Sequence, residues 1–235
     1  SCSLTSSDVP NQWKTSFVRP LFKSKGSRLS VDNYRPISKL SSVGKLLEKV
    51  VTKSLMDHLS RHGAISPFQF GFRKNHSTAT QLLKCLDYCT RSLNEKRNTY
   101  VTFVDFAKCF DSVVHSKLLV ALKSKGVGSR LLSWIQTYLE GREQLIQVSD
   151  GVLSQPASIT SGIIQGSCIG PCLFLALIDP LLVRLNSIDK VQAYCFADDV
   201  KVFSQDPVQL QYALDILHSW CSTWQLRVSA QKCQI

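Results

Sequence analysis

Residues 191–203 have the sequence VQAYCFADDVKVF, in which an Ala-Asp-Asp segment separates two short apolar runs. The two runs predict β-strands joined at a hairpin tip. Such turns usually contain Gly, Asn or a single Asp, whereas Asp198 and Asp199 stand side by side here. Adjacent carboxylates repel each other unless a cation neutralises them. Mg²⁺ is the expected cation because it prefers oxygen ligands.

Two acids at one turn cannot hold two metal ions by themselves, so a third carboxylate is expected at the end of another strand. Asp105 follows Tyr100–Val104, a Val- and Thr-containing run that predicts a buried strand. A charge there must be paired, hydrogen-bonded or metal-bound, and a helix cap or a salt bridge to Lys108 is the structural alternative. We therefore predict that Asp105, Asp198 and Asp199 bind two Mg²⁺ ions, with Mn²⁺ as an alternative. Two such metal ions activate an attacking hydroxyl and stabilise a leaving pyrophosphate.

The composition favours a globular protein with a polyanionic partner. At 235 residues and 44% hydrophobic content, the chain can form one domain or two packed subdomains. Its formal net charge of +11 indicates binding to phosphates or acidic lipids. The basic residues concentrate in the first quarter, which favours a phosphate-tracking face over an ordinary solvated surface. They are Lys14, Arg19, Lys23, Lys25, Arg28, Arg35, Lys39, Lys45, Lys49 and Lys53.

The nine cysteines are odd in number and scattered, which indicates reduced thiols and an intracellular protein. No CxxC or HExxH motif is present, so a structural zinc site is not expected. Three pairs do have i,i+4 spacing: Cys85 with Cys89, Cys168 with Cys172, and His58 with His62. The longest apolar run, Cys172–Val183, contains Asp179 and Pro180 and is too short to span a bilayer. No signal peptide precedes it, so we expect no membrane partner, and the chain reads as an excerpt of a longer protein.

The periodicity along the chain predicts a mixture of helices and antiparallel hairpins, which is the α+β class. Helices are expected near 42–62, 77–93, 115–125, 129–140, 170–185 and 207–224, and strands or extended segments at 13–22, 100–106, 144–148, 152–159 and 226–228. Asp150-Gly151 is expected to form the turn of the hairpin between 144 and 159.

Five ordered blocks of this sequence resemble the reverse transcriptases of non-LTR (LINE-type) retrotransposons, and they are most similar to jockey-like elements. The blocks are Phe22–Val51, Gln69–Leu83, Val104–Leu119, Ser161–Phe174 and Tyr194–Phe203. The resemblance implies a right-hand polymerase with an antiparallel palm sheet and packed helices, without a thumb. It implies fingers at 1–97 and a palm at 98–235, with 121–162 returning to the fingers. The implied function is RNA-directed DNA polymerase. The chain is then a fragment of a retrotransposon polyprotein, and because it lacks a thumb, we expect this fragment to be inactive by itself.

The resemblance also implies roles for the palm residues. Asp105 and Asp198 match the metal ligands of two palm motifs, and Asp199 completes the acidic pair. Phe110 matches the bulky residue beneath the sugar, where a ring excludes a 2′-hydroxyl and selects deoxynucleotides; plain core packing is its alternative. Phe106 is assigned to the nucleotide site with it.

Further matches concern the triphosphate and the nucleic acid. Arg35 matches a triphosphate-binding arginine, and either Lys23 or Lys25 is its companion. Gln165-Gly166 matches the segment beside the nascent base pair, where Gly lets backbone approach closely. Three residues are assigned to template or primer, and Lys232 is assigned as a general acid near the departing pyrophosphate. The three are Arg73, Phe196 and Ala197.

The implied partners are an RNA template, a DNA primer or nicked target DNA, and dNTPs. A ribonucleoprotein in nucleus and cytoplasm is expected, and the oligomeric state is left open. A viral RNA-dependent RNA polymerase is one alternative, but such enzymes usually have Gly before the Asp pair and a polar residue near the ribose, where this chain has Ala197 and Phe110. A catalytically silent RNA-binding relic is another, and the presence of all the acids and glycines favours competence over decay.

Overall fold

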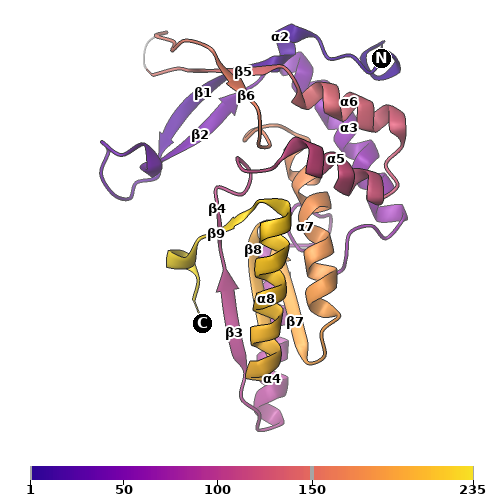
Figure 1. Ribbon diagram of the computed structural model, residues 1–235, viewed down its shortest axis with the longest axis vertical. Coiled ribbons are helices and arrows are strands. Elements are labelled where there is room, and N and C mark those ends of the chain that lie inside the picture. The colour runs from indigo at the N-terminus through magenta and orange to yellow at the C-terminus, as the bar shows by residue number, and fades with distance from the viewer. Residues whose placement is uncertain (1, 149–150, 235) are drawn as a thin grey trace. The chain divides into compact units, whose positions relative to one another are not determined.

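The computed structural model describes residues 2–148 and 151–234, which form two compact units. Unit 1 contains Ser1–His58 and Val114–Gly170, and unit 2 contains Leu59–Val113 and Pro171–Ile235. Each unit is therefore built from two separate stretches of the chain. Figure 1 gives the element labels used below.

Unit 1 is organised around a four-stranded sheet with the strand order β2-β1-β5-β6. Strands β1 and β2 pair antiparallel, β1 and β5 pair parallel, and β5 and β6 pair antiparallel. The strands are β1 (Thr15–Phe22), β2 (Tyr34–Lys39), β5 (Arg142–Ile146) and β6 (Ala157–Ile159). The helical elements are α1 (Cys2–Ser6), α2 (Asn11–Lys14), η1 (Val31–Asn33), α3 (Ser42–Arg61), α5 (His115–Ser124) and α6 (Ser129–Leu139), of which α3 ends inside unit 2.

Unit 2 is organised around a three-stranded antiparallel sheet with the order β3-β8-β7. Its strands are β3 (Tyr100–Val104), β7 (Val191–Phe196) and β8 (Asp199–Ser204), and a second small sheet pairs β4 (Phe106–Ala107) with β9 (Arg227–Val228). The helical elements are α4 (Thr78–Asn94), α7 (Gly170–Asn186), α8 (Pro207–Trp224) and η2 (Ala230–Lys232).

Helices cover both faces of the β3-β8-β7 sheet. Side chains of a strand alternate between its faces, and Lys201 and Phe203 of β8 both point to α4. Lys201 Nζ lies 2.8 Å from Gln81 Oε1. The Phe203 ring lies 5.4 Å from the ring of Tyr88. Helix α8 packs on β8 and β7, and Figure 1 shows it in front of β8. The sheet is thus buried on both sides, which fits its apolar strands.

Local sequence signals explain several element ends. Ser77 caps α4 in a capping box with Thr80. Asp206 caps α8 directly before Pro207 at the first helical position. Gly126 and Gly141 have φ of 74° and 63°, the left-handed conformation that glycines commonly adopt after a helix, here α5 and α6. The apolar α7 lies in the core, as is typical of a helix without a polar face.

Some predicted elements differ from the observed ones. The expected strand 100–106 is two strands, because the chain leaves β8 after Val104 and pairs with β9 from Phe106. The expected extended segment 13–22 begins two residues later, after the short helix α2. The hairpin between 144 and 159 is present, and Gly151 has φ of 86°. Asp150 of its predicted turn lies outside the described residues.

Two leucine-rich patterns are less buried than helical spacing suggested. On α3, Val51, Leu55 and Leu59 are buried, whereas Leu46 and Val50 are more than half exposed. On α4, all four leucines of the predicted pattern are exposed, and they are Leu82, Leu83, Leu86 and Leu93. Amphipathic spacing thus identified both helices but not the exact width of their buried faces.

The boundaries of the compact units lie elsewhere than the expected subdomain boundary at residue 97. The cause is α4, which packs on β7 and therefore belongs with the later part of the chain. The assignment of the subdomains at 1–97, 98–235 and 121–162 stays a prediction. Within the described ranges, no helix combines the length and apolarity needed to cross a bilayer.

Candidate active site

The three predicted aspartates gather at one end of the β3-β8-β7 sheet. Val104 pairs with Val200, so Asp105 lies beside the start of β8. Asp198 and Asp199 occupy the hairpin between β7 and β8, where Phe196 pairs with Asp199. Strand pairing thus joins acids that are far apart in sequence, as predicted.

The acids influence one another electrostatically. Partial burial raises the pKa of the Asp199 carboxyl, and the charges of Asp198 and Asp105 raise it further, while Lys201 and Lys232 act in the opposite direction. The charges of Asp105 and Asp198 therefore make it harder for the Asp199 carboxyl to ionise. A bound cation would relieve this repulsion.

Lys232 lies against Asp105. Its Nζ is 3.1 Å from Asp105 Oδ1, and its side chain is 65% exposed. The backbone guides this contact, because β9 pairs with β4 and the Ser229 N–H donates to the Asp105 carbonyl at 2.8 Å. The last part of the chain thus brings an ammonium group to the acid cluster.

Cys109 is a contact of Asp198 that the sequence did not identify. It is buried, and its Sγ donates a hydrogen bond to Asp198 Oδ2 at 3.0 Å. Burial and the charge of Asp198 raise the pKa of this thiol, so it stays a donor. The sequence signal that could have identified Cys109 is its position four residues after Asp105, inside the block Val104–Leu119.

Within residues 2–148 and 151–234, no three His, Cys, Asp or Glu side chains are grouped as a ready metal site. No disulfide joins the cysteines described from Cys85 to Cys233. The aspartates nevertheless supply the oxygen donors that Mg²⁺ prefers. To bind such an ion, the Asp105 carboxylate would give up its contact with Lys232, and the Asp198 carboxylate would give up its hydrogen bond from Cys109.

The two predicted aromatic residues differ in exposure. Phe110 is half-buried and stacks on Phe174, with ring centroids 4.5 Å apart and an interplanar angle of 20°. Phe106 is 3% exposed, so its ring belongs to the core. Phe110 is thus more accessible than Phe106, and the nucleotide contacts of both residues stay predictions.

Arg73 is held by the backbone of its own loop. Its Nη1 donates to the carbonyls of Ser66 at 2.5 Å and Gln69 at 3.1 Å. Burial lowers the pKa of its guanidinium, and the charge of Asp179 opposes this effect. Asp179 Oδ1 in turn accepts from Ser66 N at 2.7 Å. The template contact predicted for Arg73 stays a prediction beside this structural role.

In unit 1, the predicted triphosphate ligands share one hairpin. Lys23 and Lys25 follow β1, and Arg35 lies on β2, where it pairs with Leu21. All three basic residues are exposed. Lys23 Nζ donates to the carbonyl of Asp32 at 2.8 Å, which orients it across the loop.

The Gln165-Gly166 segment contacts the same strand β2. The Gln165 carbonyl accepts from Ser38 N at 2.9 Å. Gly166 has φ of 106°, and a Cβ there would lie 2.6 Å from Ser38 O. Ser38 is three residues from Arg35, about 10 Å along a strand. The fold of unit 1 therefore brings two distant predicted motifs together.

A buried carboxylate, missed by the sequence reasoning, supports this loop. Glu48 of α3 is 3% exposed. It accepts from Cys168 N at 2.6 Å, from Ile169 N at 3.4 Å and from Tyr138 Oη at 3.0 Å. It fixes the chain directly after Gly166. In the sequence, Glu48 stands next to Lys49 on a predicted helix, and such a charged pair gives no sign of burial.

The chain resembles known polymerases in sequence. The family profile described as "Reverse transcriptase (RNA-dependent DNA polymerase)" matches residues 23–235. The RNA-directed DNA polymerase from mobile element jockey of Drosophila melanogaster is 30% identical over 95% of this chain and 25% of its own length. The probable RNA-directed DNA polymerase from transposon BS of the same species is 30% identical over 95% of this chain and 26% of its own length. The chain thus spans about a quarter of these curated relatives.

Solved structures show the fold. Apo telomerase from Candida tropicalis superposes with a TM-score of 0.74 over 97% of this chain and 45% of that chain, at 10% identity. Telomerase from Candida albicans in complex with a TWJ fragment of telomeric RNA gives 0.67 over 99% and 44%, at 12% identity. The predicted α+β class and right-hand polymerase fold are confirmed, and the described residues include no thumb.

Proposed function

We propose, from the premise that this chain belongs to the reverse transcriptase (RNA-dependent DNA polymerase) family, that it adds dNTPs to a primer 3′ end on an RNA template. It is a domain homologous to the polymerases of non-LTR retrotransposons, and we place it in a longer polyprotein. The observation that carries the proposal is the meeting of Asp105 with the Asp198-Asp199 turn at one end of an antiparallel sheet.

A divalent metal centre at these three aspartates is part of the proposal, with two Mg²⁺ ions and Mn²⁺ as the alternative. The donor set fits, because carboxylate oxygens suit these ions and because the mutual repulsion that raises the Asp199 pKa is relieved by a cation. Bound ions would activate the primer hydroxyl and stabilise the leaving oxygen. Asp105 and Asp198 would be the main ligands, and Asp199 would add charge.

The remaining palm residues serve the nucleotide in this proposal. Lys232 would donate a proton to the departing pyrophosphate, and its contact with Asp105 supports a position near the reacting groups. Phe110, which is half-buried and stacks on Phe174, would exclude a 2′-hydroxyl with its ring. Phe106 would support this site from the core.

In unit 1, Arg35 and one of Lys23 and Lys25 would bind the triphosphate, because charge stabilisation is the main requirement of phosphoryl transfer. Gln165-Gly166 would pack beside the nascent base pair. The exposure of the three basic side chains supports the first role, and the close approach of Gly166 to Ser38 supports a fixed loop for the second.

The proposed partners are an RNA template, a DNA primer or nicked target DNA, and dNTPs. The net charge of +11 supports a nucleic-acid partner. Arg73, Phe196 and Ala197 would lie near template or primer. A ribonucleoprotein in nucleus and cytoplasm follows from the proposed retrotransposon role.

The test is primer extension by the full-length protein that carries this chain. On an RNA template with dNTPs and Mg²⁺, the parent should extend the primer, and Asp198→Asn should abolish extension. Asp215→Asn, an exposed acid on α8, is the matched control and should leave extension unchanged. Undiminished extension by Asp198→Asn would contradict the metal site. Salt-dependent RNA binding by a parent that incorporates no nucleotide would instead identify a binding relic.

A further inference from the structure

The turn that carries Asp198 contains a residue in an unfavourable backbone conformation. Ala197 has φ of 58°, a region that residues with a Cβ rarely adopt. Gly adopts positive φ at some other turns of this chain, as at Gly151, and residues with a Cβ do so at others, as at Lys190. Contacts from elsewhere must therefore hold Ala197 in place.

Gln69 supplies these contacts from a distant part of the sequence. Its Nε2 donates to the Ala197 carbonyl at 3.2 Å, and its Oε1 accepts from the Ala197 N–H at 3.0 Å. Oε1 also accepts from Gly71 N at 2.7 Å. One side-chain amide thus satisfies both backbone groups of the residue before Asp198. Gln69 is 0% exposed, so water does not compete for these bonds.

The segment around Gln69 is itself fixed to β7. Phe70 N donates to Cys195 O at 2.8 Å, and Cys195 N donates to Phe68 O at 2.9 Å. Gly71 packs directly on the turn, since a Cβ there would lie 2.3 Å from Ala197 N. The amide therefore has a rigid support from which it can fix the turn.

We infer that Gln69 is a positioning residue of the polymerase centre, which holds the Ala197 backbone and thereby sets the direction of the Asp198 carboxylate. The inference rests on the proposed function. Gln69 acts on the Asp198 carboxylate through the Ala197 backbone. Its loss should therefore lower kcat, because small displacements of reacting groups are costly, while the KM for dNTP should change little.

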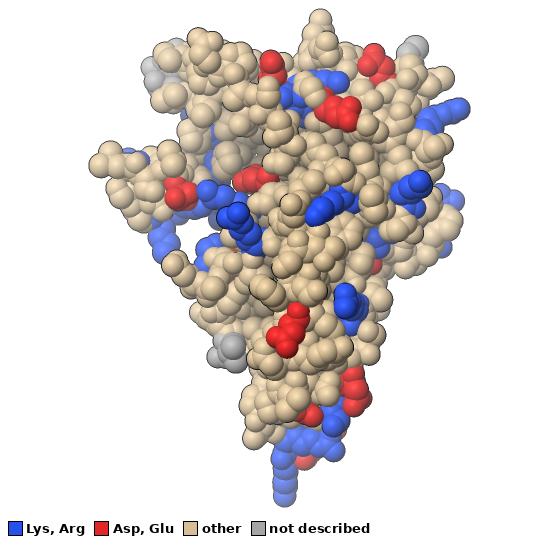
Figure 2. Space-filling view, in the orientation of Figure 1, with Lys and Arg blue, Asp and Glu red and all other residues tan. Residues whose placement is uncertain are grey.

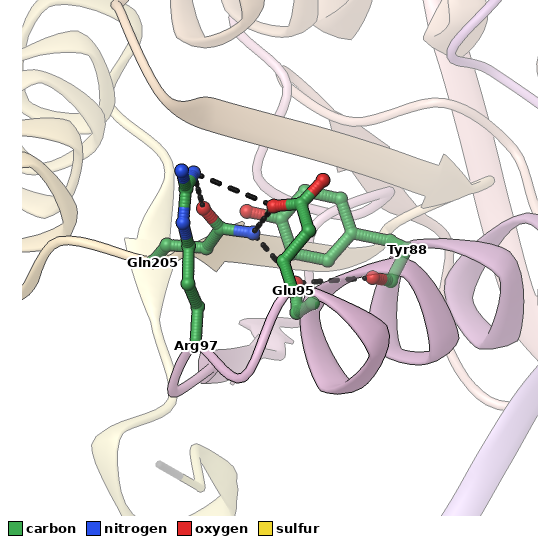
Figure 3. Close-up of polar contacts among 5 residues, drawn as sticks. Tyr88, Glu95, Arg97 and Gln205 are labelled. Carbon is green, nitrogen blue, oxygen red and sulfur yellow. Dashed lines mark hydrogen bonds and ion pairs between the residues drawn. The ribbon is translucent and has the colours of Figure 1, made fainter.

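A matched pair of variants separates this role from general loss of packing. Gln69→Met keeps the length and volume of the side chain and removes its amide. Gln205→Met makes the same change directly after the end of β8 remote from Asp199. Figure 3 shows the Gln205 amide beside Arg97 and Glu95: it accepts from Arg97 Nη1 at 3.0 Å and donates to Glu95 Oε2 at 3.4 Å. It also donates to Ser92 Oγ at 2.9 Å.

The first measurement is hydrogen exchange by mass spectrometry on the full-length protein, without nucleotide or metal. We expect the Ala197 amide to exchange about tenfold faster in Gln69→Met than in the parent, because its acceptor is lost. Gln205→Met should leave exchange at Ala197 unchanged. Equal exchange at Ala197 in Gln69→Met and the parent would overturn the inference. If Gln69→Met does not fold, Gln69→Asn, which keeps the amide on a shorter side chain, should give a smaller increase by the same reasoning.

The second measurement is single-nucleotide incorporation under saturating Mg²⁺. We expect kcat to fall about 10- to 100-fold in Gln69→Met, with KM for dNTP within about threefold of the parent. A kcat equal to that of Gln205→Met would overturn the inference. A parent that incorporates nothing would contradict the proposed function, and the exchange result would then still decide whether Gln69 fixes the turn.

Discussion

Lys232 Nζ lies 3.1 Å from Asp105 Oδ1, although 65% of the Lys232 side chain is exposed. An exposed ion pair of this kind contributes about 1 kcal/mol or less to stability. The contact therefore matters more for what the ammonium can reach than for the fold. Its position beside a proposed metal ligand is what general-acid catalysis needs.

Replacing Lys232 should separate activity from stability. We expect Lys232→Met to lower the rate of nucleotide addition roughly 100-fold and to change the free energy of unfolding by less than about 1 kcal/mol. Rapid-quench kinetics measures the rate of nucleotide addition, and urea denaturation measures the free energy of unfolding. Lys190→Met is the control, since Lys190 forms an exposed ion pair with Asp206, 3.7 Å away, at the other end of the sheet. Equal rates for both variants would remove Lys232 from the mechanism.

At the end of the sheet where Lys190 lies, two arginines form ion pairs with neighbouring acids. Arg91 contacts Asp87 at 2.8 Å and Arg97 contacts Glu95 at 3.4 Å. Figure 2 shows acidic and basic atoms side by side at the lower end of the view. Substitutions there change local charge without touching the acid cluster.

Glu48 should be a stability determinant of unit 1. Glu48→Ala leaves the Tyr138 hydroxyl and the N–H groups of Cys168 and Ile169 without their acceptor. We expect a loss of about 3 kcal/mol or more in the free energy of unfolding, whereas Glu48→Gln, which retains an acceptor oxygen, should cost less. Urea denaturation measures both. Glu140→Ala, at an exposed site, should stay within about 0.5 kcal/mol of the parent. A loss for Glu48→Ala no larger than this would show that the network is dispensable.

We predict that position 166 needs glycine for two reasons: its φ is positive, and there is no room for a Cβ. Gly166→Ala places a Cβ 2.6 Å from Ser38 O at a φ of 106°. Gly151→Ala is the matched control, because its φ of 86° is also positive but no atom lies within 4 Å of the added Cβ. We expect Gly151→Ala to lose about 1–2 kcal/mol of stability from backbone strain, and Gly166→Ala to lose more because its Cβ also meets Ser38 O. Only Gly166→Ala should also raise the KM for dNTP. An unchanged KM would argue against a nucleotide contact at this loop.

Phe110 tests sugar selection. Phe110→Ala removes the ring that stacks on Phe174 and should increase the ratio of rNTP to dNTP incorporation about tenfold or more. Competition between rATP and dATP on a poly(U) template measures this ratio. Phe103→Ala, which removes an equally large ring from a site that is 44% exposed on β3, should leave the ratio unchanged. If both variants keep the ratio of the parent, Phe110 serves only the core.

Local patterns predicted much of this fold. The capping residues Ser77 and Asp206 mark helix starts because their side chains bond nearby N–H groups. The Asp198-Asp199 turn was recognisable because the charges are costly there. These signals act over a few residues and are therefore visible in the sequence.

Contacts between distant segments were not visible. Gln69 lies 128 positions before Ala197, and nothing in its neighbourhood reveals that its amide is buried. Glu48 has exposed neighbours on α3, so its burial depends on Tyr138 and on the chain after Gly166. The break of the strand after Val104 required knowledge that β9 pairs with β4. Each of these depends on tertiary packing, which overrides local propensity.

Asp105 and the Asp198-Asp199 turn are proposed to form a metal-dependent polymerase centre. The most direct test is the rate of a single dNTP addition to a primer on an RNA template, measured by rapid quench with the full-length protein as Mg²⁺ is titrated. We predict Mg²⁺-dependent addition by the parent and a rate at least about a thousandfold lower for Asp105→Asn. Addition by Asp105→Asn at a rate within a few-fold of the parent would contradict it.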